Sequence, residues 1–356
     1  MSDIATNAVP SPLHPTRIGK IAFALVIGTA GGLLFRYLTM PLPWMLGAMI
    51  ATSIAAMMGL PLERSKRMRV IVITVLGVML GSAFKPEILS QATNWIGSIT
   101  GLLIWVTLIT GTVYFIFVRW VKFDKPTAYF SAAPGGFGEM VLLGTALGGD
   151  ERSISLVHTM RLMLTVMGIA LWFRLFQGYV PGTGNTMAPI ADLDPVQGAL
   201  MVGAAALGFW GGRKLKVPAG EILGPLVISA ALTLIGVADA PPPREAVNLA
   251  QLVLGTTIGC RFVGVPIAKV FKTLMIGAGA TLLMLSAAIL GAFGMEWLIA
   301  LPFPVLLLAF APGGLAEMCL ISLALGIDIA FVSTHHTIRL IFLILCLPLV
   351  FRYLKD

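Results

Sequence analysis

Long runs of apolar residues alternate with short polar stretches along most of this chain. A run of about 17 to 25 apolar residues is long enough to cross a bilayer as a helix. The pattern therefore predicts an all-α integral membrane protein, with longer polar stretches only at residues 1–17 and roughly 178–196. In the first half the apolar segments are approximately 18–38, 43–60, 68–84, 93–118, 128–148 and 153–177, and six similar segments follow.

The second half of the chain repeats the first. "APGGFGEM" at 133–140 returns as "APGGLAEM" at 311–318, and "VLGVMLGSAF" at 75–84 returns as "VLGTTIGCRF" at 253–262, each 178 residues later. "HTMRL" returns as "HTIRL" at the same distance, and residues 133–162 match their copies at 16 of 30 positions. We therefore interpret the chain as a polar tail (1–17), a first repeat (18–178), an acidic linker (179–195) and a second repeat (196–354).

Charge is scarce, and its placement gives the orientation of the repeats. Only 11% of residues are charged and 58% are hydrophobic, against about 25% charged in an average soluble domain. Basic loops follow the second and fourth apolar segments of the first half, but the first and third of the second half. In the first half they contain Arg64, Lys66, Arg67 and Arg69, then Arg119, Lys122 and Lys125; in the second half they contain Arg213, Lys214 and Lys216, then Lys269 and Lys272. Basic loops stay on the cytoplasmic side. The displacement by one loop therefore predicts inverted repeats, each crossing the membrane an odd number of times.

Six segments and an odd number of crossings require one segment per half to enter and leave on the same side. Pro134, Gly135 and Gly136 would break a helix, and broken backbone at membrane depth is tolerated where it lines a cavity. We expect about five transmembrane helices plus a re-entrant broken helix in each repeat. Whether segments 128–148 and 304–325 re-enter or span is left open. This topology places both termini in the cytoplasm and the linker outside.

The repeated motif carries residues suited to binding an anion. A half-helix that begins after the glycine pair directs free N–H groups to membrane depth, and a helix N-terminus attracts anions. On the next segment a histidine and an arginine three residues apart share a face of the helix. An arginine at this depth in the membrane costs free energy on insertion. An inverted duplication brings both copies to one midplane site. The predicted substrate-binding residues are Gly135, Gly136, Glu139, His158 and Arg161, with their copies Gly313, Gly314, Glu317, His336 and Arg339.

Each of these residues also has a purely structural interpretation. Arg161 and Arg339 can pair with Glu139 and Glu317 as buried bridges, and the glutamates can serve only the helix dipole. The histidines can be hydrogen-bonded core residues. Near a cavity, however, desolvated glutamates would suit proton coupling. Other residues with an assigned role are the GxxxG glycines Gly77, Gly81, Gly255 and Gly259, expected at close helix contacts, the capping residues Gly148, Gly149, Asp150, Gly326 and Asp328, and Glu221 as a weaker site candidate.

The "PWMLG", "VLGVMLG", "APGGFGEM" and "HTMRL" blocks closely resemble the bacterial membrane AbrB family, built from two AbrB duplication units, over nearly the whole chain after residue 17. This family is distinct from the small DNA-binding protein of the same name. The resemblance implies a multi-pass protein of the bacterial cell inner membrane, and its members are labelled ammonia monooxygenase, AbrB-type regulator or transporter. In architecture, the predicted halves also look like the glutamate and 2-hydroxycarboxylate symporters.

Three functions follow from these observations. The first is secondary transport of a small anionic organic solute, which needs the bilayer as partner and no cofactor, with coupling to Na+ or H+ open. The second is an indirect effect on gene expression, because short basic loops do not form a DNA-reading element, so no nucleic-acid partner is expected. The third is a copper or iron monooxygenase; only four histidines exist, and no enzyme activity is expected. Homo-oligomerisation is left open.

Overall fold

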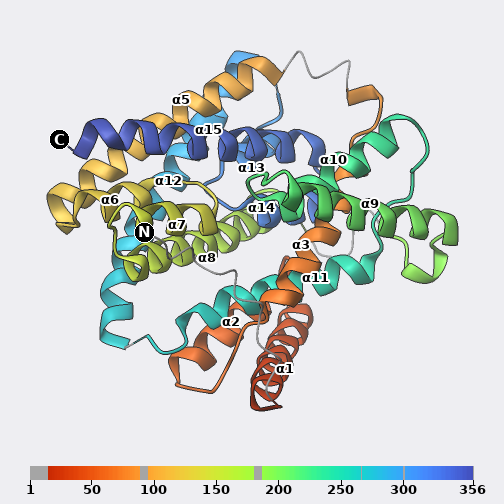
Figure 1. Ribbon diagram of the computed structural model, residues 1–356, viewed down its shortest axis with the longest axis horizontal. Coiled ribbons are helices and arrows are strands. Elements are labelled where there is room, and N and C mark those ends of the chain that lie inside the picture. The colour runs from red at the N-terminus through yellow and green to blue at the C-terminus, as the bar shows by residue number, and fades with distance from the viewer. Residues whose placement is uncertain (1–14, 89–94, 180–186, 266, 300, 356) are drawn as a thin grey trace, which may run out of the picture.

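The chain folds into helices joined by short turns (Figure 1). The computed structural model describes residues 15–88, 95–179, 187–265, 267–299 and 301–355, so most of the predicted polar tail and residues 180–186 of the linker lie outside the described residues. The helices of the first repeat are α1 (Pro15–Tyr37), α2 (Pro43–Met57), α3 (Lys66–Gly81), α5 (Trp95–Ile116), η2 (Phe117–Val121), α6 (Lys125–Ala132), α7 (Phe137–Ala146) and α8 (Glu151–Phe176). After η3 (Ile190–Asp192) come α9 (Pro195–Lys214), α10 (Gly220–Leu234), α11 (Arg244–Gly259), η4 (Cys260–Phe262), α12 (Ile267–Ile299), α13 (Phe303–Phe310), α14 (Leu315–Leu325) and α15 (Ile329–Lys355).

The order of helices in the first repeat returns in the second. Helices α3 and α11 begin and end 178 residues apart, and so do α6 and α13. The capping residues are also duplicated: Asp150 accepts from the N–H of Ser153 at 3.0 Å before α8, and Asp328 accepts from that of Phe331 at 3.0 Å before α15. These caps satisfy N–H groups that the first helical turn leaves free. The sequence prediction of duplicated caps is thus confirmed.

Five helices are long and apolar enough to cross a membrane within the described part of the chain, and they span Thr16–Tyr37, Trp95–Val121, Glu151–Phe176, Thr273–Ile299 and Ile329–Tyr353. Helices α2, α3, α10 and α11 have only 15 or 16 residues. At 1.5 Å per residue, such helices are shorter than the hydrocarbon core of about 30 Å.

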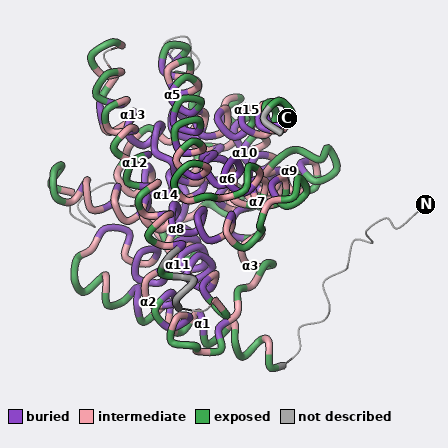
Figure 2. Tube along the Cα trace, turned by 90° about the vertical axis from the view of Figure 1, so that its left-hand side faces the viewer, coloured by how far each residue is buried: buried purple, intermediate pink, exposed green. Residues whose placement is uncertain are grey.

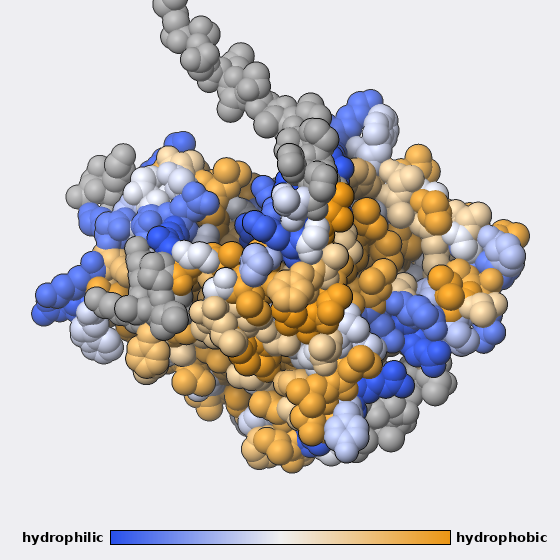
Figure 3. Space-filling model, turned by 90° about the horizontal axis from the view of Figure 1, so that it is seen from below, coloured by the Kyte–Doolittle hydropathy of each residue, from blue (hydrophilic) through white to orange (hydrophobic). Residues whose placement is uncertain are grey.

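Large apolar side chains cover much of the outer surface, as expected of a protein in contact with lipid. Figure 3 shows hydrophobic residues across the centre of one face and hydrophilic residues gathered toward its sides. Trp297 is 89% exposed, and Leu108 and Leu290 are 66% and 71% exposed. The buried residues concentrate in the middle of the molecule, where helices of both repeats meet (Figure 2).

The helices form two groups, and each group combines both repeats. In the first, which we call the glycine group, α1 to α3 pack with α9 to α11: α10 lies on α3, and α11 lies on α2. The second, the hairpin group, contains α5 to α8 and α12 to α15, with α8 against α12 and α15 against α5. In Figure 1, α1, α2 and α11 of the glycine group lie together at the bottom, and α5, α13 and α15 lie at the top. The repeats therefore exchange helices with each other.

Glycines make the contacts between repeats in the glycine group. A Cβ added to Gly77 would collide with the carbonyl oxygen of Ile222, and one added to Gly255 would collide with that of Met45. Because α3 and α11 carry no side chains at these glycines, their backbones approach those of the opposing helices closely. The close helix contacts predicted for these glycines are confirmed, and their partners belong to the opposite repeat.

Candidate functional site

Both proline–glycine motifs interrupt a helix, as the sequence predicts. Helix α6 ends at Ala132 and α7 begins at Phe137, while α13 ends at Phe310 and α14 begins at Leu315. The residue before each following helix is extended: the N-cap of α7, Gly136, has φ −62° and ψ 137°, and that of α14, Gly314, has φ −83° and ψ 155°. Each break frees carbonyl groups of the preceding turn and N–H groups of the following one.

Arg161 anchors the first break from the neighbouring helix α8. Its side chain is 2% exposed, and Nη1 and Nη2 donate to the carbonyl oxygens of Ala133 (2.8 Å) and Gly135 (3.0 Å). His158, one turn earlier, is fully buried, and its Nε2 lies 2.9 Å from the carbonyl oxygen of Phe130. The guanidinium thus uses the carbonyls that the helix break leaves without intrahelical donors.

Arg339 anchors the second break in the same way. Its Nη1 and Nη2 donate to the carbonyl oxygens of Ala311 and Gly313, both at 2.6 Å, and Nε2 of His336 lies 2.8 Å from that of Leu308. A further contact exists here, because Nη2 of Arg339 lies 2.9 Å from Nδ1 of His336. An arginine can only donate, so this Nδ1 accepts, and the ring is neutral with its proton on Nε2.

The two glutamates of the motifs bend back over the start of their own helices. The carboxylate of Glu139 lies against Gly136, in the space where a Cβ would stand, and that of Glu317 lies against Gly314 in the same way. Within the described residues, neither glutamate forms an ion pair with Arg161 or Arg339. The paired-bridge alternative is therefore not what the structure contains. A carboxylate in the first turn of a helix is stabilised by the helix dipole.

A cavity of about 460 Å³ lies where the two broken helices meet the glycine group. Residues 134–139 line it from the first break and residues 313–317 from the second, and Leu162 and Leu340 contribute from α8 and α15. The glycine group closes the other side with parts of α3, α9 and α10. The cavity therefore lies between the repeats and also between the two helix groups.

Most of the predicted site residues line this cavity. They are Gly135, Gly136, Glu139, Gly313, Gly314, Glu317, His336 and Arg339. His158 and Arg161 are not among its lining residues and stay buried behind the first break. The structure thus brings both breaks to one place, but only one of the two buried arginines contributes to the cavity wall.

The model of the family described as "Transition state regulatory protein AbrB" matches residues 44–355. The chain belongs to the AbrB family. It is 28% identical over 362 residues to a protein of Bacillus subtilis (strain 168) named "Uncharacterized protein YhjN", covering 95% of this chain and 94% of that one. It is 24% identical over 328 residues to "Putative regulator AbrB" of Escherichia coli (strain K12), covering 90% and 92%. The resemblance seen in the sequence blocks is confirmed.

Sequence reasoning missed four basic residues that line the cavity of this AbrB-family protein. Arg69 comes from the first turn of α3, Arg213 from the last turn of α9, Lys216 from the loop just after α9, and Arg261 from η4. From the sequence, Arg69, Arg213 and Lys216 were interpreted only as basic-loop residues that indicate the orientation of the repeats. A sign that Arg261 differs from its surroundings is visible when the repeats are aligned, because its counterpart at position 83 is alanine.

Glu221, the weaker site candidate, also lines the cavity. With Glu221 included, the charged lining residues still have a net positive charge. Two of the lining carboxylates, Glu139 and Glu317, come from the breaks. Five cationic side chains face these three carboxylates: Arg69, Arg213, Lys216, Arg261 and Arg339. Across the described part of the chain, no three His, Cys, Asp or Glu side chains group as they would around a metal ion.

Proposed function

We propose that this AbrB-family protein is a secondary transporter of a small anionic organic solute, which binds in the cavity between the repeats. The observation that carries the proposal is the cavity itself: both broken helices line it, and its cationic side chains outnumber its carboxylates. A cavity of about 460 Å³ falls within the range of small-molecule sites, about 300 to 1,000 Å³. Cationic walls around such a space favour an anion.

In this proposal the repeats are inverted and each broken helix is re-entrant. Arg69, Arg213 and Lys216 belong to the basic loops that the positive-inside rule assigns to the cytoplasm, and all three line the cavity. The described state would then be open to the cytoplasm. Since the cavity lies between the glycine group and the hairpin group, movement of one group against the other would expose it on the opposite side.

The positions of the arginines favour protons over sodium as the coupling ion. Carbonyl oxygens of broken helices are the usual ligands for Na+ in such transporters. Here Arg161 and Arg339 already donate to those of residues 133, 135, 311 and 313. Coupling would instead use the two glutamates at the helix starts, because a protonated carboxyl no longer competes with an anionic solute for the N-terminal N–H groups. The other ionisable groups on the cavity wall are Arg69, Arg213, Lys216, Glu221, Arg261, His336 and Arg339.

Uptake by proteoliposomes tests this function. With purified full-length protein and a panel of radiolabelled small carboxylates, we expect accumulation driven by an inward proton gradient and indifferent to a sodium gradient. Glu139→Gln and Glu317→Gln should lose the dependence on the proton gradient. Glu151→Gln is the matched control, because Glu151 is exposed at the start of α8 and does not line the cavity. The proposal fails if no carboxylate accumulates, and proton coupling fails if all three variants behave alike.

Indirect regulation remains the alternative that the name of the E. coli relative suggests for this chain. A transporter that changes the cytoplasmic level of a signalling solute would alter gene expression without touching DNA. In that case the glutamate variants should lose the transcriptional effect together with proton-driven accumulation.

A further inference from the structure

Arg261 is a cationic side chain with unsatisfied hydrogen-bond donors among the residues that the structure describes. It lies in η4 directly after α11 and lines the cavity. Its Nε and Nη1 atoms are shielded from solvent, and no described residue accepts a hydrogen bond from them. A charged donor that has lost water and gained no acceptor is costly. A negatively charged ligand in the cavity would balance the charge of the guanidinium and so reduce this cost.

Phe137 holds the guanidinium of Arg261 by its face. The Cζ atom lies 3.5 Å from the centroid of the Phe137 ring. Such stacking fixes the plane of an arginine. Nη2, which is not among the shielded atoms, is then the guanidinium nitrogen that a carboxylate in the cavity can reach. Since Phe137 is the first residue of α7, a ligand bound to Arg261 would lie near the N-terminus of that half-helix.

The pair of Arg261 and Phe137 occurs once, because neither repeat supplies both residues. The counterpart of Arg261 in the first repeat is Ala83, and the counterpart of Phe137 in the second is Leu315. The arginine comes from the second repeat and the ring from the first, so the stack forms once in the cavity. A structural role common to both repeats would have been duplicated, as the anchoring arginines are. The stacked arginine is therefore suited to a task that the cavity needs once.

The charge balance of the cavity limits the charge of its ligand. Five cationic side chains and three carboxylates on the wall leave a formal charge of at least +2, which rises by one with each glutamate that takes up a proton. A ligand with two negative charges therefore suits the site, while a monoanion would leave at least one cationic group unpaired in a partly enclosed space.

We propose that Arg261 binds a carboxylate of the solute and that the solute is a small dicarboxylate. This inference specifies the substrate class and the recognising residue for the proposed transport function, on which it rests. Charge-assisted hydrogen bonds from guanidinium to carboxylate are short and strong, and the stack on Phe137 places the donors before the ligand arrives.

Thermal stabilisation of the purified full-length protein tests the assignment, because a ligand that binds the native state raises its stability. The probes are succinate, butyrate and succinamide at constant ionic strength: a dianion, a monoanion and a neutral diamide of the same carbon number. We expect succinate to bind the wild type about tenfold more tightly than butyrate, and succinamide not to bind. Arg261→Ala should weaken succinate at least about tenfold, the loss expected for one charged hydrogen bond.

Arg64→Ala is the matched control for the removal of charge. Arg64 interacts electrostatically with Arg261 but does not line the cavity, so this variant should retain wild-type affinity for succinate. Arg261→Lys keeps the charge without the planar fork and should fall between the two. Phe137→Leu places at this position the residue of the second repeat, and it should weaken succinate by loosening the arginine. These milder variants keep the test valid if Arg261→Ala does not fold.

Two results would overturn the inference: equal affinities in the Arg261 and Arg64 variants, or a wild type that no carboxylate stabilises saturably. A wild type that prefers butyrate would refute the dicarboxylate. Failure of the transport function looks different. Succinate binding that depends on Arg261, without uptake by proteoliposomes, would refute transport and leave the binding assignment standing.

Discussion

In the first repeat Arg161 donates to the carbonyls of Ala133 and Gly135, and in the second Arg339 donates to those of Ala311 and Gly313. The anchors are alike, but the surfaces in front of them differ. Arg339 and His336 reach the cavity wall, whereas Arg161 and His158 do not. Both repeats keep the arginine and the histidine that hold the break in place. The residues that reach the cavity differ between the repeats.

The largest expected effect comes from removing the anchors. Arg161→Ala and Arg339→Ala each remove two hydrogen bonds from a charged guanidinium to buried carbonyls, which should lower the free energy of unfolding by about 3 kcal/mol or more. Arg339→Ala should cost about 1 kcal/mol beyond Arg161→Ala, because it also removes the donor to Nδ1 of His336. Reversible unfolding in mixed micelles measures both values.

Arg152→Ala is the control for these variants. Arg152 lies on the same helix as Arg161, and its single bond to the carbonyl of Gly264 is exposed, so the change should cost about 0.5 kcal/mol or less. If Arg161→Ala proved as mild as this control, the shared anchoring of the breaks would be wrong. If it cost more than Arg339→Ala, the difference between the repeats would be reversed.

A smaller effect is expected where the repeats pack on each other. Gly77→Ala and Gly255→Ala should each lower the free energy of unfolding by about 1 to 3 kcal/mol, since the new Cβ meets a carbonyl oxygen of the opposite repeat. Gly111→Ala lies in helix α5 with nothing near the added Cβ and should gain up to about 1 kcal/mol. Similar costs at Gly77 and Gly255 would support the exchange of helices, and a neutral result at either would contradict it on that side.

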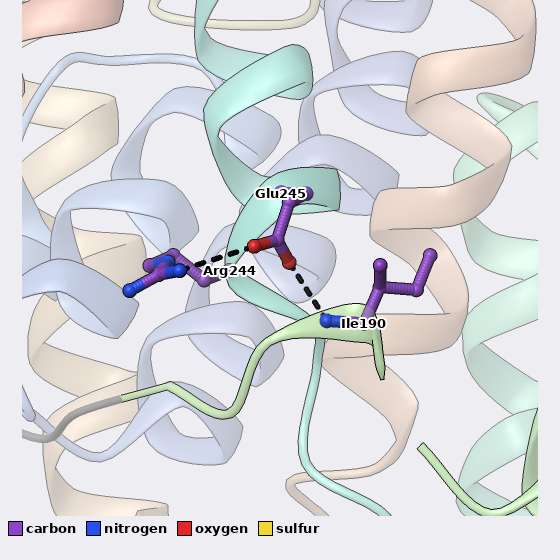
Figure 4. Close-up of polar contacts among 3 residues, drawn as sticks. All are labelled: Ile190, Arg244 and Glu245. Carbon is purple, nitrogen blue, oxygen red and sulfur yellow. Dashed lines mark hydrogen bonds and ion pairs between the residues drawn. The ribbon is translucent and has the colours of Figure 1, made fainter. Parts of the chain in front are cut away.

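The smallest effect concerns a contact that only one repeat makes. Glu245 accepts from the N–H of Ile190 in the linker at 2.9 Å and from Nη2 of Arg244 at 3.2 Å (Figure 4). Its counterpart in the first repeat is Arg67, a residue of opposite charge. The backbone bond from Ile190, more than Arg244, lowers the pKa of Glu245 below its ordinary value of 4.5.

A carboxyl with a lowered pKa stabilises the folded state above its ordinary pKa, and this contribution disappears as the pH falls through the lowered value. The melting temperature of the wild type should therefore drop slightly more than that of Glu245→Gln when the pH falls from about 6 to about 3. The two curves should stay parallel above about pH 5. If the wild type instead gained melting temperature relative to Glu245→Gln as the pH fell, the sign of this linkage would be contradicted.

The sequence was sufficient for features that follow directly from the type of a residue. The proline and glycines at 134–136 predicted the break, and Asp150 with its copy Asp328 predicted the caps. The GxxxG spacing predicted close contact but not its partner, because small residues on a helix do not specify what approaches them. Only the folded chain shows that Gly77 meets Ile222.

The partners of the buried arginines could not be derived from residue types either. Glu139 was the visible counter-charge for Arg161, but the acceptors are backbone carbonyls that become free only when the helix breaks. Arg69 was assigned to a basic loop, since nothing local indicates that the first turn of α3 faces a cavity. The mismatch between Ala83 and Arg261 was visible, but without the fold a single difference between repeats carries little weight.

The exchange of helices in the glycine group has a consequence for how the protein is made. Helix α3 packs mainly on α10, and α2 packs on α11 as well as on α1; α10 and α11 lie far downstream in the chain. At about 5 to 20 residues per second, a ribosome would leave the glycine faces of the first repeat uncovered for roughly ten seconds or more. A nascent chain in that interval offers surfaces to any neighbouring helix in the membrane. Biogenesis would therefore favour conditions that keep the first half apart until the second has been inserted.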